Sequence, residues 1–212
     1  TFFLSSIFFY KIILNRFNND YYAILITIFY VTTPRIFAES FYNSQDIIFM
    51  CFCVFTLYFL LQFLDEFKLK DIILFSLFSA LSTSIRVLGV IFFFLFIVFI
   101  LFNILEKKNF FKNSYIKILS YLVSYPIFVY FFWPFLWDAP IQNFIIAFKS
   151  FANYDLNNNI FYLGQYTKAT NLPWHYIPTW IFITLPIFIL LFFLVRFFKV
   201  LKKFVNNYLN LS

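Results

Sequence analysis

Charged residues, glycine and histidine are all scarce in this chain of 212 residues. Only 12% of its residues are charged, whereas 63% are hydrophobic and 27% are aromatic. The surface of a soluble globular domain requires about a quarter of charged residues. The composition therefore excludes that class and indicates an integral membrane protein. The single histidine, His175, excludes a metal site built from several histidines.

The few cysteines and the positive charge exclude two further functions. Cys51 and Cys53 lie in an apolar run, and their spacing turns the two thiols about 200° apart on a helix. They indicate neither a disulfide nor a metal site. A net charge of +7 would suggest a nucleic-acid partner in a soluble protein. Here the basic residues flank apolar runs, so no nucleic acid is expected and the partners are membrane lipids.

Seven apolar runs divide the chain. They cover residues 1–14, 21–33, 47–64, 72–85, 87–105, 118–136 and 177–198. A helix needs about 20 residues to cross a ~30 Å hydrocarbon core, so the longer runs are credible spans and the shorter ones are weaker. The predicted fold is an all-α integral membrane protein with about seven transmembrane helices and outward-facing juxtamembrane helices. It is expected to form a single polytopic domain over residues 1–212.

The distribution of Lys and Arg predicts the orientation. If all seven runs cross, twelve basic residues lie on one side, and the other side keeps Arg35, Arg86, Lys149 and Lys168. Lys and Arg concentrate in cytoplasmic loops, so the first side, which includes the C-terminus, is assigned to the cytoplasm. One helix over residues 72–105 would break this asymmetry. A break is therefore predicted near residues 82–89.

The outward side contains a charged stretch, "TPRIFAESFYNSQDI". Thr33 before Pro34 indicates a helix start. If that helix continues into the next span, Arg35, Glu39 and Asp46 lie within about 60° of one another. A carboxylate buried in lipid costs about 2.5–3.5 kcal/mol at a helix centre, so Asp46 is expected to face an aqueous cavity and is the strongest candidate. For Arg35 and Glu39, an ordinary exposed ion pair remains the competing interpretation.

A second polar stretch, "STSIRVLG", contains Arg86. A guanidinium at the outer end of a helical hairpin can bind a lipid headgroup or a substrate phosphate through its fork of donors. A side chain that merely extends to the interface is the alternative. Gly89 is expected to allow a close approach of another group.

The outer loop, residues 137–176, supplies the remaining candidates. Apolar residues recur at helical spacing after Pro140, which predicts a helix lying in the membrane surface. His175 and Tyr176 either belong to an aromatic belt or line a sugar site. Lys168 is a candidate partner for an anion.

Four segments in this order carry a resemblance to a known family: "TPRIFAESFYNSQDIIF", "SALSTSIRVLGVIFF", "WPFLWDAPIQNF" and "YLGQYTKATNLPWHYIPTWIFITLPIFIL". They resemble multi-span glycosyltransferases of the C superfold, in the branch related to protein O-mannosyltransferases and lipid A aminoarabinose transferases (family 39-type). The resemblance implies sugar transfer from a polyprenyl-phosphate donor to an acceptor on the periplasmic face of a bacterial inner membrane. The lipid-linked sugar donor is the implied partner.

The same resemblance implies roles for individual residues. Asp46 matches an acid near the donor phosphate or a bound metal, which leaves a divalent ion open as a cofactor. Arg86 matches a basic position at the outer end of the following hairpin. The family's most diagnostic acid, usually taken as the catalytic base, has no counterpart here. The chain is therefore expected to be an N-terminally truncated fragment with its base upstream.

Two other classes remain as alternatives. A transporter or channel subunit would place ionisable groups near mid-membrane and show internal repeats, which are not evident in the sequence. A non-enzymatic scaffold predicts no outward cleft that joins Asp46 to Arg86. A separation of more than about 20 Å between these side chains, well beyond the reach of screened electrostatics, would favour the scaffold.

Overall fold

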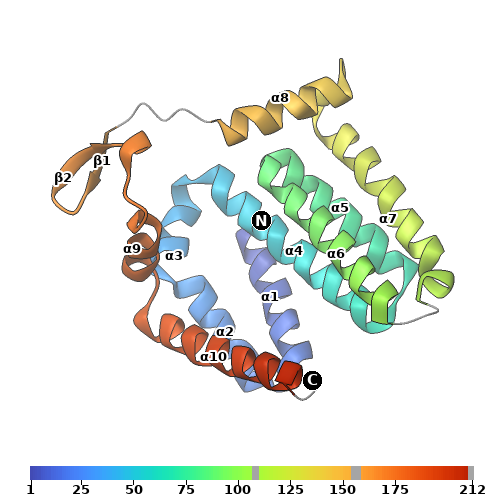
Figure 1. Cartoon of the computed structure of the whole chain (residues 1–212), viewed down its shortest axis with the longest axis horizontal. Helices are drawn as coiled ribbons and strands as arrows, with labels where there is room; N and C mark the ends of the chain where they lie inside the picture. Colours follow the sequence, from blue (N-terminus) through green and yellow to red (C-terminus); the bar gives the residue numbers. More distant parts are fainter. Residues whose placement is uncertain (107–109, 154–158, 210–212) are drawn as a thin grey trace. The chain divides into compact units, whose positions relative to one another are not determined.

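The computed structural model describes residues 1–106, 110–153 and 159–209 (Figure 1). Within them the chain forms ten α-helices and one two-stranded antiparallel hairpin. These elements divide into two compact units, Thr1–Tyr154 and Asp155–Ser212, and each unit has its own packing.

The first unit consists of eight α-helices and two short 3₁₀ turns. The helices are α1 (Phe2–Phe17), α2 (Asp20–Thr32), α3 (Pro34–Tyr42), α4 (Ser44–Glu66), α5 (Leu69–Ile85), α6 (Ile91–Glu106), α7 (Phe110–Phe132) and α8 (Pro140–Ala152). The 3₁₀ turns are Val87–Val90, between α5 and α6, and Pro134–Leu136, before α8. Figure 1 shows α4, α5, α6 and α7 running along one another, with α8 at one end of them.

Local chemistry explains where several helices begin and end. Asn18 adopts a left-handed conformation with φ of 48° and ends α1, and Asn19 then caps α2 by accepting a hydrogen bond from the Tyr22 amide. Asparagine suits both positions because it tolerates positive φ and its side-chain oxygen can cap a helix. These two residues turn the chain back so that α1 and α2 pack against each other.

Small hydroxyl residues on α5 hold the centre of the first unit together. Their hydroxyl groups form four contacts with neighbouring helices: Ser76 with Ser124 at 2.7 Å, Ser79 with Tyr121 at 3.3 Å, Thr83 with Tyr125 at 2.9 Å and Ser82 with Thr56 at 3.4 Å. Small residues let helix backbones approach closely in a membrane, and each interhelical hydrogen bond there stabilises by about 0.6 kcal/mol on average. Helix α5 is thereby joined to both α4 and α7.

An aromatic cluster fills the remaining space among these helices. The ring of Tyr121 stacks on Phe75 with centroids 4.8 Å apart and lies 4.3 Å from the ring of Phe96. All three side chains are buried. Aromatic pairs at such distances contribute about 0.5–1.5 kcal/mol each beyond their burial, so the many Phe and Tyr residues form a specific core.

The prediction of a mainly helical chain with apolar, membrane-like helices is confirmed at a coarse level. Among the residues that the structure describes, α4 and residues 115–132 of α7 are long and apolar enough to cross a bilayer. The bent pairs α2–α3 and α9–α10 raise the number of candidate spans to at most four. Seven spans therefore stay a prediction. The predicted break near residues 82–89 is confirmed, because α5 ends at Ile85 and α6 begins at Ile91.

The second unit starts with a hairpin that the all-α prediction did not include. Strand β1 (Asn159–Tyr162) pairs with β2 (Gln165–Lys168), and a 3₁₀ turn (Ala169–Asn171) follows. Helices α9 (Tyr176–Thr184) and α10 (Ile187–Leu209) complete the unit. A single domain over residues 1–212 stays a prediction beside this division into two units.

Candidate functional site

The charged stretch folds as two helices that meet at Asn43. Helix α3 begins after Thr33 with Pro34 in its first turn, as predicted, and ends at Tyr42. The expected continuous helix from Arg35 to Asp46 is wrong. Asn43 has φ of −95° and ψ of 79°, which are not helical angles, and it becomes the N-cap of α4.

Asn43 connects the two carboxylates that flank it. Its side-chain Nδ2 donates to Glu39 Oε2 at 3.0 Å and to Asp46 Oδ2 at 2.9 Å, while its Oδ1 accepts from the Asp46 backbone N–H at 3.0 Å. The last bond is an ordinary N-cap bond to the third helical residue. The break in the helix thus brings Glu39 and Asp46 together through one amide. The sequence reasoning missed this residue, although its position three residues before an acid is a recognisable capping pattern.

Arg35 extends this polar chain at its other end. Arg35 Nε lies 2.9 Å from Glu39 Oε1, one helical turn away. The side chain of Arg35 is 55% exposed and that of Glu39 is 17% exposed. An (i, i+4) pair on a helix surface contributes about 0.3–0.5 kcal/mol, and here only Arg35 is largely exposed. Its main effect is to orient Glu39 toward Asn43.

Arg86 is held in place by the turn that follows α5. Its backbone N–H donates to Ser82 O at 3.0 Å, and its carbonyl accepts from the Gly89 N–H at 2.8 Å. Gly89 is buried and packs directly on α5, where a Cβ atom would lie only 2.5 Å from the backbone of Ser82 and Thr83. The expected close approach at Gly89 is therefore an approach of the protein's own backbone. This close contact fixes the backbone of the turn against α5 and thereby the position of the Arg86 Cα atom.

Asp46 and Arg86 form an ion pair between the start of α4 and the end of α5. Asp46 Oδ1 contacts Arg86 Nη2, and the two side chains are 48% and 35% exposed. At this exposure the pair is worth at most about 1 kcal/mol. The contact is the opposite of the wide separation that the scaffold interpretation predicts. It places both candidates in one polar cluster, which consists of Arg35, Glu39, Asn43, Asp46 and Arg86.

Arg86 retains an unused hydrogen-bond donor. Its Nε is buried and has no hydrogen-bond partner among the described residues. A buried donor without an acceptor costs about 1–3 kcal/mol. About a third of the Arg86 side chain is exposed, so an anionic ligand can approach that exposed part while Nη2 keeps its contact with Asp46. The guanidinium fork therefore has the chemistry of an anion site with one side already occupied.

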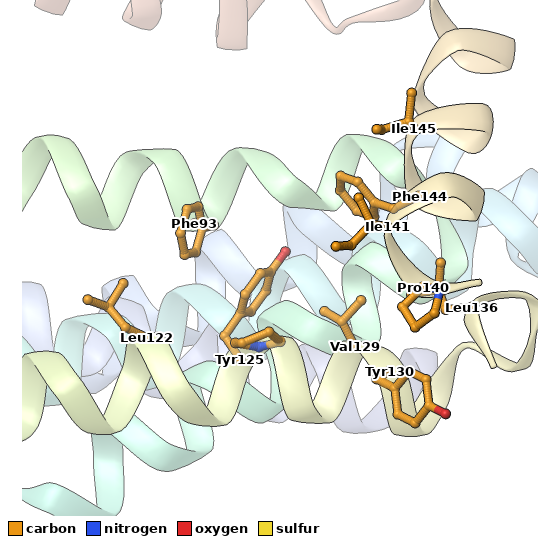
Figure 2. Close-up of a pocket in the computed structure, with 11 residues that line it drawn as sticks. Phe93, Leu122, Tyr125, Val129, Tyr130, Leu136, Pro140, Ile141, Phe144 and Ile145 are labelled. Carbon is orange, nitrogen blue, oxygen red and sulfur yellow. The ribbon is translucent and has the colours of Figure 1, made fainter. Parts of the chain in front are cut away.

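An apolar groove lies between α6, α7 and α8. A cavity of about 370 Å³ is lined by Phe93, Leu122, Tyr125, Pro126, Val129, Tyr130, Leu136, Pro140, Ile141, Phe144 and Ile145. Figure 2 shows the α8 residues facing those of α6 and α7 across it. A second cavity of about 310 Å³ shares Phe144 and Ile145 and also contacts Val90, Phe94, Phe148 and Lys149. These two cavities together are called the α8 groove.

The α8 groove suits an apolar chain with an anionic end. Its lining is aliphatic and aromatic, and Lys149 is the cation among its residues. Val90, at the end of the 3₁₀ turn after Arg86, lines the cavity that contains Lys149. The amphipathic helix predicted after Pro140 is confirmed as α8, and it forms one wall of the groove.

The remaining sequence candidates lie in the second unit. His175 and Tyr176 stand at the start of α9, and the ring of Tyr162 contacts both, with centroid distances of 5.7 and 5.1 Å. Lys168 ends strand β2 and is exposed. These three residues therefore belong to a different compact unit from Asp46 and Arg86.

The polar cluster offers few ligands for a metal ion. Within the described parts of the chain, no group of three or more His, Cys, Asp or Glu side chains lies close enough to hold one. The two oxygens of Asp46 already contact Arg86 and Asn43. No residue is therefore assigned to a metal.

Comparison with known proteins identifies a related family. Residues 2–136 match the family described as dolichyl-phosphate-mannose-protein mannosyltransferase. This match covers more than half of the chain and includes Asp46, Arg86 and the helices that carry them. Neither a curated protein nor a solved structure matches the chain significantly.

Proposed function

The chain belongs to the dolichyl-phosphate-mannose-protein mannosyltransferase family, and from this premise we propose that it transfers a sugar from a polyprenyl-phosphate donor to an acceptor. The reaction takes place at the non-cytoplasmic face of a bacterial inner membrane. In this orientation the C-terminus and most of the basic residues lie in the cytoplasm. The chain is a membrane glycosyltransferase of the mannosyltransferase type, and the donor, the acceptor side and the residue roles are the proposal.

The ion pair between Asp46 and the partly exposed guanidinium of Arg86 carries the proposal. Transfer breaks the bond between the anomeric carbon and the phosphate oxygen, and the phosphate leaves with the bonding electrons. The acceptor hydroxyl forms the new bond to that carbon and gives its proton to a base. Arg86 stabilises the leaving phosphate, because a fixed cation at a developing negative charge lowers the barrier. No residue of this chain is assigned as the base.

Asp46 positions Arg86 for this step. Its carboxylate contacts Nη2 on one side and accepts from Asn43 on the other, so the guanidinium is oriented before the donor arrives. Orientation of this kind removes an entropic cost from the reaction step. Glu39 and Arg35 support Asn43 from the α3 side.

The α8 groove accommodates part of the donor's polyprenyl chain. Its apolar lining attracts isoprene units through van der Waals packing, and Lys149 lies at the groove for the anionic end. Within the second unit, the ring cluster of Tyr162, His175 and Tyr176 is a candidate carbohydrate contact by its own chemistry. Aromatic faces with polar tips suit a carbohydrate.

The decisive experiment measures sugar transfer by Asp46→Asn and Arg86→Ala variants. Membranes that contain the full-length protein are supplied with radiolabelled polyprenyl-phosphate mannose. We expect each substitution to lower the transfer rate by about 100- to 1,000-fold, the usual effect of losing one group that stabilises a developing anion. Arg16→Ala is the matched control, because Arg16 is an exposed arginine in the last turn of α1 and does not belong to the polar cluster. It should transfer at the wild-type rate.

Near-normal transfer by both variants would rule out this site. A loss in Arg86→Ala that Arg86→Lys restores in full would show that charge alone suffices and that the guanidinium fork has no role.

A further inference from the structure

The hairpin of the second unit has an unusual residue at its tip. Leu163 and Gly164 form its two-residue turn, and both have positive φ, 48° and 84°. Turns of this kind favour Asn-Gly, because residues other than Gly, Asn and Asp are strained at positive φ. Leucine is thus a costly choice here, and its side chain is 71% exposed. A strained and exposed leucine at a loop tip indicates an apolar neighbour.

The strand register separates the hairpin into two different faces. On one face Tyr162 is buried, and its hydroxyl donates to Thr179 Oγ1 of α9 at 3.0 Å. On the other face Phe161 is paired directly with Tyr166, with ring centroids 5.1 Å apart. These two rings are 60% and 75% exposed. One face therefore attaches the hairpin to α9, and the opposite face presents aromatic rings outward.

The outward face also carries a cation at its base. Lys168 pairs with Asn159 in the same register as the Phe161–Tyr166 pair, so it lies on the same face two residues further along β2. Two residues of a strand span about 7 Å. From the turn outward, this face carries first a leucine, then two aromatic rings and finally a lysine. A bilayer interface accepts groups in this order, with the apolar group deepest and the cation nearest the headgroups.

The chain connects this face directly to a candidate membrane segment. Trp174, which is 88% exposed, lies between the hairpin and α9. Helix α9 and residues 187–202 of α10 are together long and apolar enough for one membrane segment, and a bend of 118° divides it. Their apolar side chains, including Ile177 and Ile183, are largely exposed in the unit. The hairpin is therefore close in sequence to apolar helices that suit a lipid environment.

We propose that the outward face of the hairpin inserts into the interfacial layer of the bilayer next to α9. Leu163, Phe161 and Tyr166 enter below the lipid phosphates, and the ammonium of Lys168 pairs with a phosphate of a phospholipid headgroup. The hairpin is thus a membrane anchor that fixes the start of α9 at the surface. This inference does not depend on sugar transfer, because its test measures depth rather than activity.

The test places spin labels on both faces of the hairpin in the full chain. The protein is reconstituted into vesicles of phosphatidylethanolamine and phosphatidylglycerol, with Cys51 and Cys53 replaced by alanine. Labels are attached at Leu163→Cys and Tyr166→Cys, and at Gln165→Cys as the matched control beside the tip on the inner face. Collision with oxygen, which concentrates in lipid, is compared with collision with a water-soluble nickel chelate.

We expect labels at positions 163 and 166 to lie about 5–10 Å below the phosphates, the depth usual for interfacial anchors, and the label at 165 to contact water. Contact of all three labels with the nickel chelate would overturn the proposal. Protection of positions 163 and 166 from both reagents would also overturn it, because the hairpin would then be packed on protein.

A second variant tests whether the side chain of Leu163, rather than the conformation of the turn, holds the hairpin in the bilayer. Leu163→Asn gives the Asn-Gly pair that this turn favours, so the hairpin should be retained in water. In this background the label at Tyr166→Cys should become accessible to the nickel chelate. An unchanged depth would show that the tip does not hold the hairpin in the bilayer, and the proposal would fail.

Discussion

Substitution of Gly89 by alanine tests how the 3₁₀ turn after α5 positions Arg86. A Cβ atom on residue 89 would lie 2.5 Å from Ser82 C and Thr83 N, and 2.8 Å from Ser82 O. All three are backbone atoms, so no side-chain rotation can relieve the contact. Ordinary contact begins at 3.4 Å, so turn and helix must separate by about 0.9 Å (3.4 − 2.5). Arg86 lies between them and must move with the turn.

Both stability and sugar transfer should respond to Gly89→Ala. Overpacking of this kind costs about 1–3 kcal/mol, which corresponds to a fall in Tm of roughly 2–12 °C for a chain of this size. A displacement of a functional group by about 1 Å can lower the rate about 100-fold. We therefore expect a moderate loss of Tm in detergent and a much larger loss of transfer from radiolabelled polyprenyl-phosphate mannose in membranes.

Leu88→Ala is the control for this prediction. Leu88 belongs to the same turn, but its side chain is exposed, so its truncation should leave both Tm and transfer near the wild-type values. Wild-type Tm for Gly89→Ala would refute the close contact between the turn and α5. A lowered Tm with normal transfer would refute the argument that the turn places Arg86 for the reaction.

Three further substitutions test the polar cluster, the α5 hydroxyls and the α8 groove. Asn43→Asp adds a third carboxylate beside Glu39 and Asp46 and should lower transfer more than Asn43→Ala does; the reverse order would contradict a bridging role for the amide. Tyr125→Phe removes the hydroxyl contact with Thr83 and should lower stability by about 0.6 kcal/mol, measured by thermal unfolding in detergent; wild-type stability would contradict a stabilising bond between the two hydroxyls. Ile145→Trp fills the α8 groove and should raise KM for a donor with a long polyprenyl chain while leaving a short-chain donor unaffected; equal KM changes for both donors would exclude the groove as the lipid site.

Much of the architecture was predictable because bilayers impose a simple rule on sequence. Long apolar runs bounded by Lys or Arg indicated helices, and the polar residues 82–89 indicated the break that separates α5 from α6. The hairpin at residues 159–168 was not predicted. Its turn consists of Leu163 and Gly164 rather than Asn-Gly, so the usual sequence signal for a hairpin is weak.

The site was predicted as separate candidates rather than as a connected cluster. Asp46 and Arg86 stood out because charges are costly beside apolar runs. Asn43 did not stand out, because asparagine is common in this chain and carries no charge. Its role arises from the end of α3 at Tyr42, which depends on backbone angles that sequence spacing alone does not fix. A continuous helix and two helices joined at a cap are both compatible with the same apolar pattern.

The contact between Asp46 and Arg86 follows from the antiparallel packing of α4 and α5. Asp46 lies 20 residues before Glu66, the last residue of α4, and Arg86 lies 17 residues after Leu69, the first residue of α5. The difference of three residues is about 4.5 Å along the helix axis, which a long arginine side chain can span. In two antiparallel helices with the same rise per residue, positions equally distant from a short connection lie at the same level. The similar height of Asp46 and Arg86 along the two helix axes was therefore predictable from the residue numbers. The direction in which each side chain points was not. That requires the rotation of α5 about its axis, which is fixed by the close packing of Ser82 against Thr56 of α4 and of Thr83 against Tyr125 of α7. The buried hydroxyls of α5 thus stabilise the unit and also direct Arg86 toward the carboxylate.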